Sequence, residues 1–193
     1  MIDQIYLDVL TQLGTHKVSH SKRTLFEHLI GTHDLLEAWK LPRKTCLAGL
    51  FHSIYGTVRF ESQAVPITSR KTIQDLIGLE AELLAYLFCV SDRREFYANI
   101  GCSTCRLHDS RGQTQWEGSP AMLDELLSMD LANWLEMYPY VGPDLSETEV
   151  TRTVQMFEEA KASFPAIAFD ALMEFKQSTC GKLKAFNNRN FLT

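Results

Sequence analysis

Residues 45–52 have the sequence TCLAGLFH, and this stretch indicates the fold class. At the 100° per residue of an α-helix its side chains are apolar on nearly every side, which is typical of a helix buried all round. Pro42 precedes the stretch and suits the first turn of a helix. The sequence therefore predicts a buried helix that ends at His52 and has other helices packed around it.

The flanking sequence supplies such helices on both sides. In residues 24–39, the leucines and Trp39 fall on one broad stripe, so this range predicts an amphipathic helix. Similar patterns predict helices over residues 2–13, over 70–90 with a break near Gly78, over 93–98 and 119–137, from Ser146 onward, and from Pro165 to about Gln177.

One segment has the pattern of a β-hairpin. Residues 109–112 (DSRG) are turn formers and are flanked by residues 105–108 (CRLH) and 113–116 (QTQW), which predicts a short hairpin at about 104–116. No repeat or linker divides the chain. We therefore expect an all-α protein that forms a single domain over residues 1–193, with residues 182–193 as a frayed tail.

Composition narrows the classes of function. The chain has 193 residues, 45% of them hydrophobic, and a net charge of −5. This charge does not favour binding to nucleic acid or to an anionic membrane. No apolar run approaches the roughly 20 residues of a membrane-spanning helix, and the first residues lack the pattern of a signal peptide.

Five irregularly spaced cysteines fit free thiols, so we expect a cytoplasmic protein without disulfides.

Two histidines point to the interior from different helices. His28 lies on the apolar stripe of residues 24–39, and His52 ends the buried helix 45–52. Unpaired imidazoles are costly to bury, and binding to a metal ion would satisfy both. The alternative is that each histidine forms a hydrogen bond with the backbone.

The spacing of these histidines resembles that of the HD-domain phosphohydrolases. Members of that family carry a histidine on one helix, a His-Asp doublet at the end of the next, and a later aspartate. His28, His52 and Asp92 resemble these three positions, and the likeness covers roughly residues 20–95. It is greatest to the hydrolase domains that degrade the stringent-response alarmone. The resemblance implies an HD-domain-like helical bundle with His28, His52 and Asp92 as metal ligands.

This sequence departs from the family at the doublet, which is His52-Ser53 instead of His-Asp. Hard cations prefer carboxylate oxygen to a neutral hydroxyl, so a site with two metals is not expected. The remaining set of two histidines and one carboxylate suits a single divalent ion, either Mn, Fe or Zn. Other carboxylates that could replace the missing aspartate are Glu27, Glu80 and Asp130.

Several candidate residues have a structural alternative. Asp92 is followed three residues later by Glu95, which is the spacing of a helix cap. His20, Arg93 and Arg94 are candidates for contacts with an anionic small-molecule substrate, although such side chains are often solvated.

Two other groups contain metal-binding residue types. Cys102, Cys105 and His108 are too few for a structural zinc site without a fourth ligand. His33-Asp34 is a literal His-Asp pair, but Asp34 should face the solvent.

Three functions remain open at this level. The first is an atypical metal-dependent hydrolase that acts on a phosphate ester or a nucleotide-like molecule, with the catalytic residues unassigned. The second is a non-haem iron oxygenase on the same fold. The third is a catalytically inactive protein that keeps the fold as a binding or interaction surface.

Overall fold

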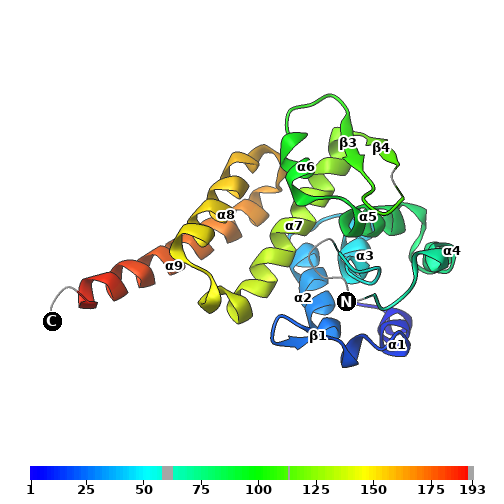
Figure 1. The fold of residues 1–193 in the computed structure, drawn as a ribbon, viewed down its shortest axis with the longest axis horizontal. Helices are drawn as coiled ribbons and strands as arrows, with labels where there is room; N and C mark the ends of the chain where they lie inside the picture. The colour runs from blue at the N-terminus through cyan, green and yellow to red at the C-terminus, as the bar shows by residue number, and fades with distance from the viewer. Residues whose placement is uncertain (58–62, 113, 191–193) are drawn as a thin grey trace.

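The structure is a computed structural model, and it describes residues 1–57, 63–112 and 114–190, with side chains through Thr179. It is mainly helical, and helix α3 (Arg43–Phe51) lies at its centre (Figure 1). Helices α2 (Leu25–Ala38), α5 (Leu79–Val90) and α7 (Pro120–Val141) pack around α3. Every residue of α3 from Thr45 to Phe51 is buried, as the apolar sequence predicts.

The N-terminal half follows the predicted helices closely. Helix α1 (Gln4–Gln12) leads into α2, whose first turn is closed by a capping box between Thr24 and Glu27. The predicted break at Gly78 separates α4 (Arg70–Ile77) from α5, and Gly78 adopts a φ of 89° that favours glycine. Helix α6 (Arg93–Ala98) follows α5 after a short turn.

The predicted hairpin is present. Strands β3 (Cys105–His108) and β4 (Gln115–Gly118) pair antiparallel, with Leu107 opposite Trp116. The all-α class with one short hairpin over this segment is therefore confirmed.

A second small hairpin lies where the sequence indicated only a loop. Strands β1 (Ser19–His20) and β2 (Arg23–Thr24) pair with His20 opposite Arg23. The two residues between them, Ser21 and Lys22, both have positive φ, at 49° and 65°. Such a turn is usually made by Asn-Gly, and neither residue occurs here, so the pattern gave no hairpin signal.

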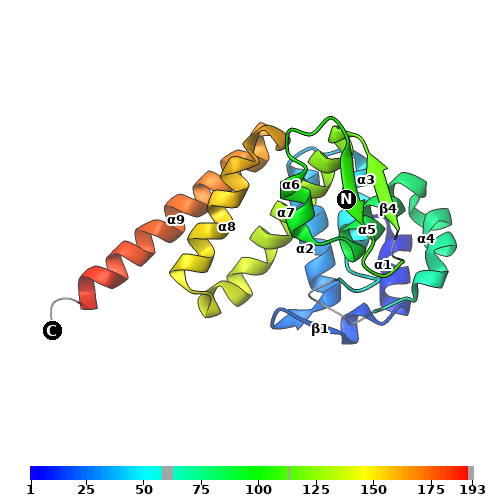
Figure 2. The same ribbon diagram turned by 45° about the horizontal axis from the view of Figure 1, so that its top comes forward.

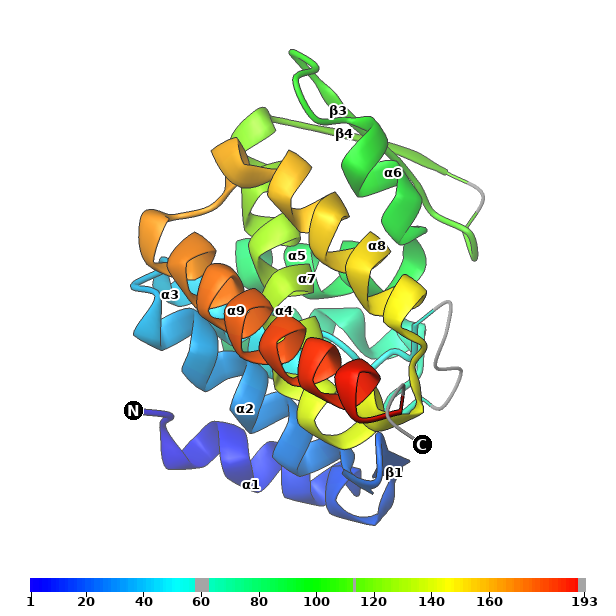
Figure 3. The ribbon, with the colours of Figure 1, turned by 90° about the vertical axis from the view of Figure 1, so that its left-hand side faces the viewer.

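Helices α8 (Glu147–Glu159) and α9 (Ala166–Asn190) lie side by side against α7 (Figure 3). Trp134 of α7 contacts both helices, with ring centroids 5.6 Å from Phe157 and 4.8 Å from Phe175. The C-terminal part of α9 extends away from the rest of the molecule (Figure 2). This helix continues past the predicted end near Gln177 into the segment expected to be frayed, and residues 191–193 lie outside the described part.

Short 3₁₀ helices connect several of these elements, at Thr15–Lys17, Ile67–Ser69, Gly142–Asp144 and Lys161–Ser163. Among the described residues, no helix is both long and apolar enough to span a membrane.

Candidate metal centre

Helices α2, α3 and α7 bring two imidazoles together inside the bundle. His28 lies in the second turn of α2 and His52 caps the C-terminus of α3, and both are fully buried. Their Nε2 atoms are 3.1 Å apart. The predicted convergence of these two histidines is present in the structure.

Asn133 of α7 supplies a third polar atom at the same point. Its Oδ1 lies 3.0 Å from the Nε2 of His28 and 3.0 Å from the Nε2 of His52. The three atoms form a nearly equilateral triangle. For metal–ligand bonds of about 2.1 Å, neighbouring ligands of an octahedral ion lie about 3.0 Å apart, whereas those of a tetrahedral ion lie about 3.4 Å apart. The spacing therefore matches one face of an octahedral site.

The opposite nitrogens of both rings are held by acceptors. Nδ1 of His52 lies 2.6 Å from the carbonyl oxygen of Gly49, and Nδ1 of His28 contacts the carboxylate of Glu136. A carbonyl or carboxylate oxygen can only accept, so each Nδ1 carries the proton and each Nε2 presents a lone pair. Metal-binding histidines commonly have this outer arrangement, which fixes the orientation and the tautomer of the ring.

The triangle thus brings two lone pairs to an amide oxygen. Within the described part of the chain, no other group donates a hydrogen bond to these three atoms. A cation at the triangle would bind all three. Turning over the Asn133 amide would instead direct its NH₂ group to both nitrogens, which is how a metal-free form could satisfy them.

Burial keeps these imidazoles neutral, which is the form that binds metal. Loss of hydration lowers the pKa of His52 from 6.5 to about 4. The same cause, followed by the neighbouring His52, holds the pKa of His28 well below its ordinary value.

A second layer of side chains surrounds His28. The ring centroid of His20 lies 4.3 Å from that of His28, and burial followed by the charge of Arg23 lowers the pKa of His20 to about 4. Arg23 forms an ion pair with Glu136, and its guanidinium lies 4.2 Å from the ring centroid of Tyr140. The predicted substrate residue His20 therefore lies beside His28.

Asp92 lies elsewhere. It caps α6, where its carboxylate accepts hydrogen bonds from the backbone N–H of Arg94 at 2.9 Å and from the Nε of Arg94 at 3.0 Å. Among the described residues, Asp92 does not belong to any group of three metal-ligand side chains within 4.8 Å of one another. The position that we expected Asp92 to fill is occupied by Asn133.

The two predicted substrate arginines also have other contacts. Arg93 is largely buried and donates to Asp130 at 3.1 Å and to the carbonyl oxygen of Phe88 at 2.5 Å. Arg94 is exposed and pairs with Asp92. The structure thus uses Arg93 to join α6 to α7 and leaves Arg94 on the surface, away from the described contacts of the two histidines.

The other candidate carboxylates are similarly accounted for. Glu27 belongs to the capping box of α2, Glu80 is exposed beside Lys44, and Asp130 accepts from Arg93 and Tyr97. Ser53, which replaces the aspartate of the doublet, is buried directly after His52.

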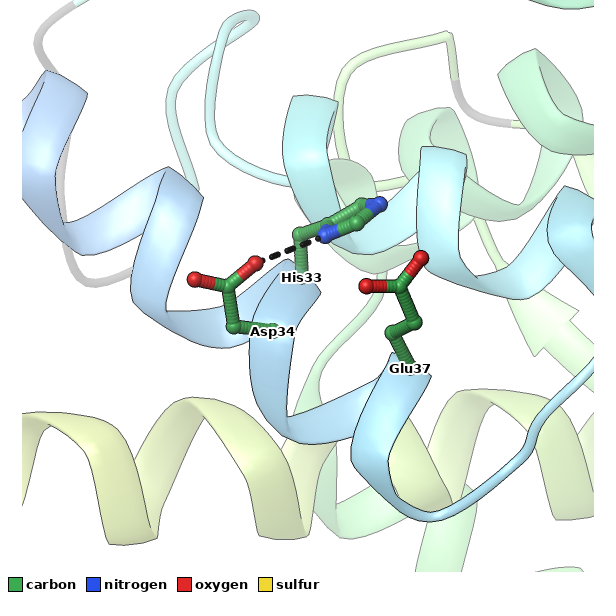
Figure 4. Close-up of side chains that lie close together, drawn as sticks. All are labelled: His33, Asp34 and Glu37. Carbon is green, nitrogen blue, oxygen red and sulfur yellow. Dashed lines mark hydrogen bonds and ion pairs between the residues drawn. The ribbon is translucent and has the colours of Figure 1, made fainter. Parts of the chain in front are cut away.

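The literal His-Asp pair lies with Glu37 in a separate cluster on α2, in which His33 is buried and the two carboxylates are exposed (Figure 4). Nδ1 of His33 lies 3.1 Å from Asp34, and the carboxylate of Glu37 is close to both. Asp34 is exposed, as expected from the sequence. His33 and Glu37 also line a cavity of about 200 Å³ that is separate from His28 and His52. Within the described residues, Cys102, Cys105 and His108 do not form a comparable cluster.

Sequence reasoning missed Asn133 and Glu136. A usable signal was present, because Asp130, Asn133 and Glu136 recur every three residues along α7. That spacing aligns their side chains on one face, toward the interior of the bundle.

Comparison with known proteins identifies one similarity. Residues 9–93 match a domain of unknown function, DUF6817. The matched range includes His28 and His52 but ends before α7, which carries Asn133 and Glu136. No match was found among curated proteins or among solved structures.

Proposed function

We propose that this protein is a metal-dependent hydrolase of phosphate esters, with one divalent ion bound by His28, His52 and Asn133. The observation that carries the proposal is the triangle of Nε2, Nε2 and Oδ1 atoms at 3.0–3.1 Å, with both Nδ1 atoms held from behind. Only three ligands come from the described part of the chain, so an octahedral ion would keep positions for water and substrate.

The ligand set favours hydrolysis over oxygen chemistry. All three ligands are neutral, so a bound divalent ion would keep its full charge toward the open positions. Such an ion attracts an anionic substrate and lowers the pKa of a bound water. Non-haem iron oxygenases use a carboxylate with two histidines, and Asn133 provides an amide in that place.

The resemblance to HD-domain phosphohydrolases supports the same class of reaction. His28 and His52 match the family's first two histidines in helix position as well as in spacing. His28 lies within α2, and His52 lies at the end of α3. Mn²⁺ and Fe²⁺ suit a mixed nitrogen and oxygen set with octahedral spacing better than Zn²⁺, which prefers a tetrahedron.

Metal binding and hydrolysis can be tested together. Elemental analysis and calorimetric titration with Mn²⁺ should show one ion per chain, and a panel of phosphate esters and nucleotides should show hydrolysis that chelator abolishes. His28→Ala and His52→Ala should lose both properties. His33→Ala is the matched control, because His33 is a buried histidine of the same helix α2 that lies outside the triangle.

The outcomes separate the three candidate functions. Tight binding of iron with oxygen consumption and no hydrolysis would favour an oxygenase. Absence of metal binding, with both histidine variants behaving like the wild type, would contradict the proposal and favour a binding protein.

A further inference from the structure

The carboxylate of Glu136 is shared between a candidate metal ligand and a buried arginine. Its Oε2 contacts the Nδ1 of His28, and its Oε1 pairs with the guanidinium of Arg23. The side chain is only 6% exposed. A buried carboxylate is costly unless it is fully paired, and here each oxygen has a partner of its own.

Gly31 makes room for this carboxylate. A methyl group added at Gly31 would lie 2.6 Å from Oε1 of Glu136, which is closer than the two atoms can approach. Gly31 lies in the interior of α2, where glycine destabilises a helix by about 1 kcal/mol relative to alanine. The helix thus carries an unfavourable residue next to Glu136.

Arg23 is itself held in place from two sides. It lies opposite His20 in the β1–β2 hairpin, and its guanidinium stacks over Tyr140, whose hydroxyl is 3.4 Å from an Arg23 nitrogen. Tyr140 is one turn beyond Glu136 on α7. Tyr140 therefore helps to hold the guanidinium that pairs with Oε1 of Glu136.

We propose that Glu136 is a positioning residue that fixes the ring of His28, through its Nδ1 proton, in the orientation and tautomer that bind the metal. This inference rests on the proposed function, since it assigns a role to a group behind one metal ligand. The charge of the carboxylate also makes the opposite nitrogen of the ring a stronger ligand. Loss of such an outer partner typically costs 10-fold to 100-fold in metal affinity.

The main test replaces the charge and keeps the shape. Glu136→Gln should weaken the binding of Mn²⁺ 10-fold to 100-fold in calorimetric titrations. Glu125→Gln is the matched control, because Glu125 lies on the same helix, is also mostly buried and pairs with Lys44 at 3.2 Å. That variant should bind Mn²⁺ like the wild type.

Gly31→Ala tests the same contact without removing a polar group. The added methyl should displace the carboxylate from His28 and weaken Mn²⁺ binding, while helix propensity alone would leave the metal-free protein as stable as the wild type or more so. Histidine ¹⁵N shifts of the metal-free protein give a second readout. In both variants, His28 should lose its strong preference for the Nδ1-protonated tautomer.

The results distinguish this inference from the proposed function. If the wild type binds no Mn²⁺, the proposed function and the inference on Glu136 are both wrong. If the wild type binds Mn²⁺ and Glu136→Gln binds it equally well with an unchanged His28 tautomer, the inference is wrong and the metal centre stands. A variant that melts earlier but binds Mn²⁺ normally when folded would also overturn it, because Glu136 would then be only structural.

Discussion

Asn133 brings an uncharged oxygen to a point where two imidazole nitrogens already converge. Replacing its amide by a carboxylate changes few atoms and adds one negative charge. The residue is half-buried, so the charge would be only partly solvated. If the proposed metal binds here, this change should strengthen its binding and destabilise the metal-free protein.

Asn133→Asp should raise the affinity for Mn²⁺ at least tenfold, which corresponds to about 1.4 kcal/mol. The physical reason is that a hard cation binds a carboxylate more strongly than an amide. Thermal melts in chelator should show a lower midpoint, because the carboxylate then faces two lone pairs without a cation. Calorimetric titration with Mn²⁺ measures the change in affinity. Unchanged affinity would show that residue 133 is not a ligand.

The buried histidines should also make stability depend on pH. His52 has a pKa of about 4 in the folded chain and about 6.5 when unfolded, so the unfolded state takes up protons first as the pH falls. The stability that the neutral His52 contributes to the folded state is complete above pH 6.5. As the pH falls from 6.5 to 4, the free energy of unfolding decreases by up to about 3 kcal/mol. His20 acts in the same direction. Urea unfolding in chelator at pH 7.5 and 5 measures this loss, and equal stabilities would contradict it.

The sequence predicted a site residue correctly where neighbouring residues in the chain determine its surroundings. It did so less well where the surroundings come from a distant helix. His28 and His52 could be predicted because an apolar stripe and a buried helix surround them in the chain itself. Asp92 could not be assigned, because an aspartate before a short helix is equally well explained as its cap, which is its observed role. The three-residue spacing of Asp130, Asn133 and Glu136 indicates a shared face, but the contact of Asn133 with His28 and His52 depends on how α7 packs against α2, and the spacing does not specify that packing.

At the scale of elements, the β1–β2 hairpin has an unfavourable turn. Ser21 and Lys22 both occupy the left-handed region, which costs about 1 kcal/mol or more for each residue other than glycine. The hairpin nevertheless places His20 and Arg23 side by side next to His28 and Glu136. Strain of this kind is often retained where it holds functional side chains in position.

Changing the turn to Asn-Gly should therefore stabilise the protein. The double variant Ser21→Asn, Lys22→Gly should raise the free energy of unfolding by about 1–2 kcal/mol, because both residues then tolerate positive φ. Urea unfolding measures the gain. Lys22→Ala is the control for the exposed ion pair of Lys22 with Asp144, which should contribute little. A double variant no more stable than the control would show that the turn is not strained.

At the scale of the whole molecule, one apolar helix was enough to predict the class of fold. A segment that is buried all round requires partners on every side, and α2, α5 and α7 provide them. The length of α9 could not be predicted. Its second half has a polar sequence without a clear apolar stripe, so periodicity gave no reason to extend the helix beyond about Gln177.

The length of α9 has a consequence for the shape of the protein in solution. Twenty-five residues at 1.5 Å each make a rod about 37 Å long, and its C-terminal part extends beyond the bundle (Figure 2). A compact chain of this length has a radius of gyration of about 16 Å. Small-angle X-ray scattering should give a larger value, with a pair-distance distribution that has a long tail. A symmetric distribution with a radius near 16 Å would mean that the end of α9 folds back onto the bundle.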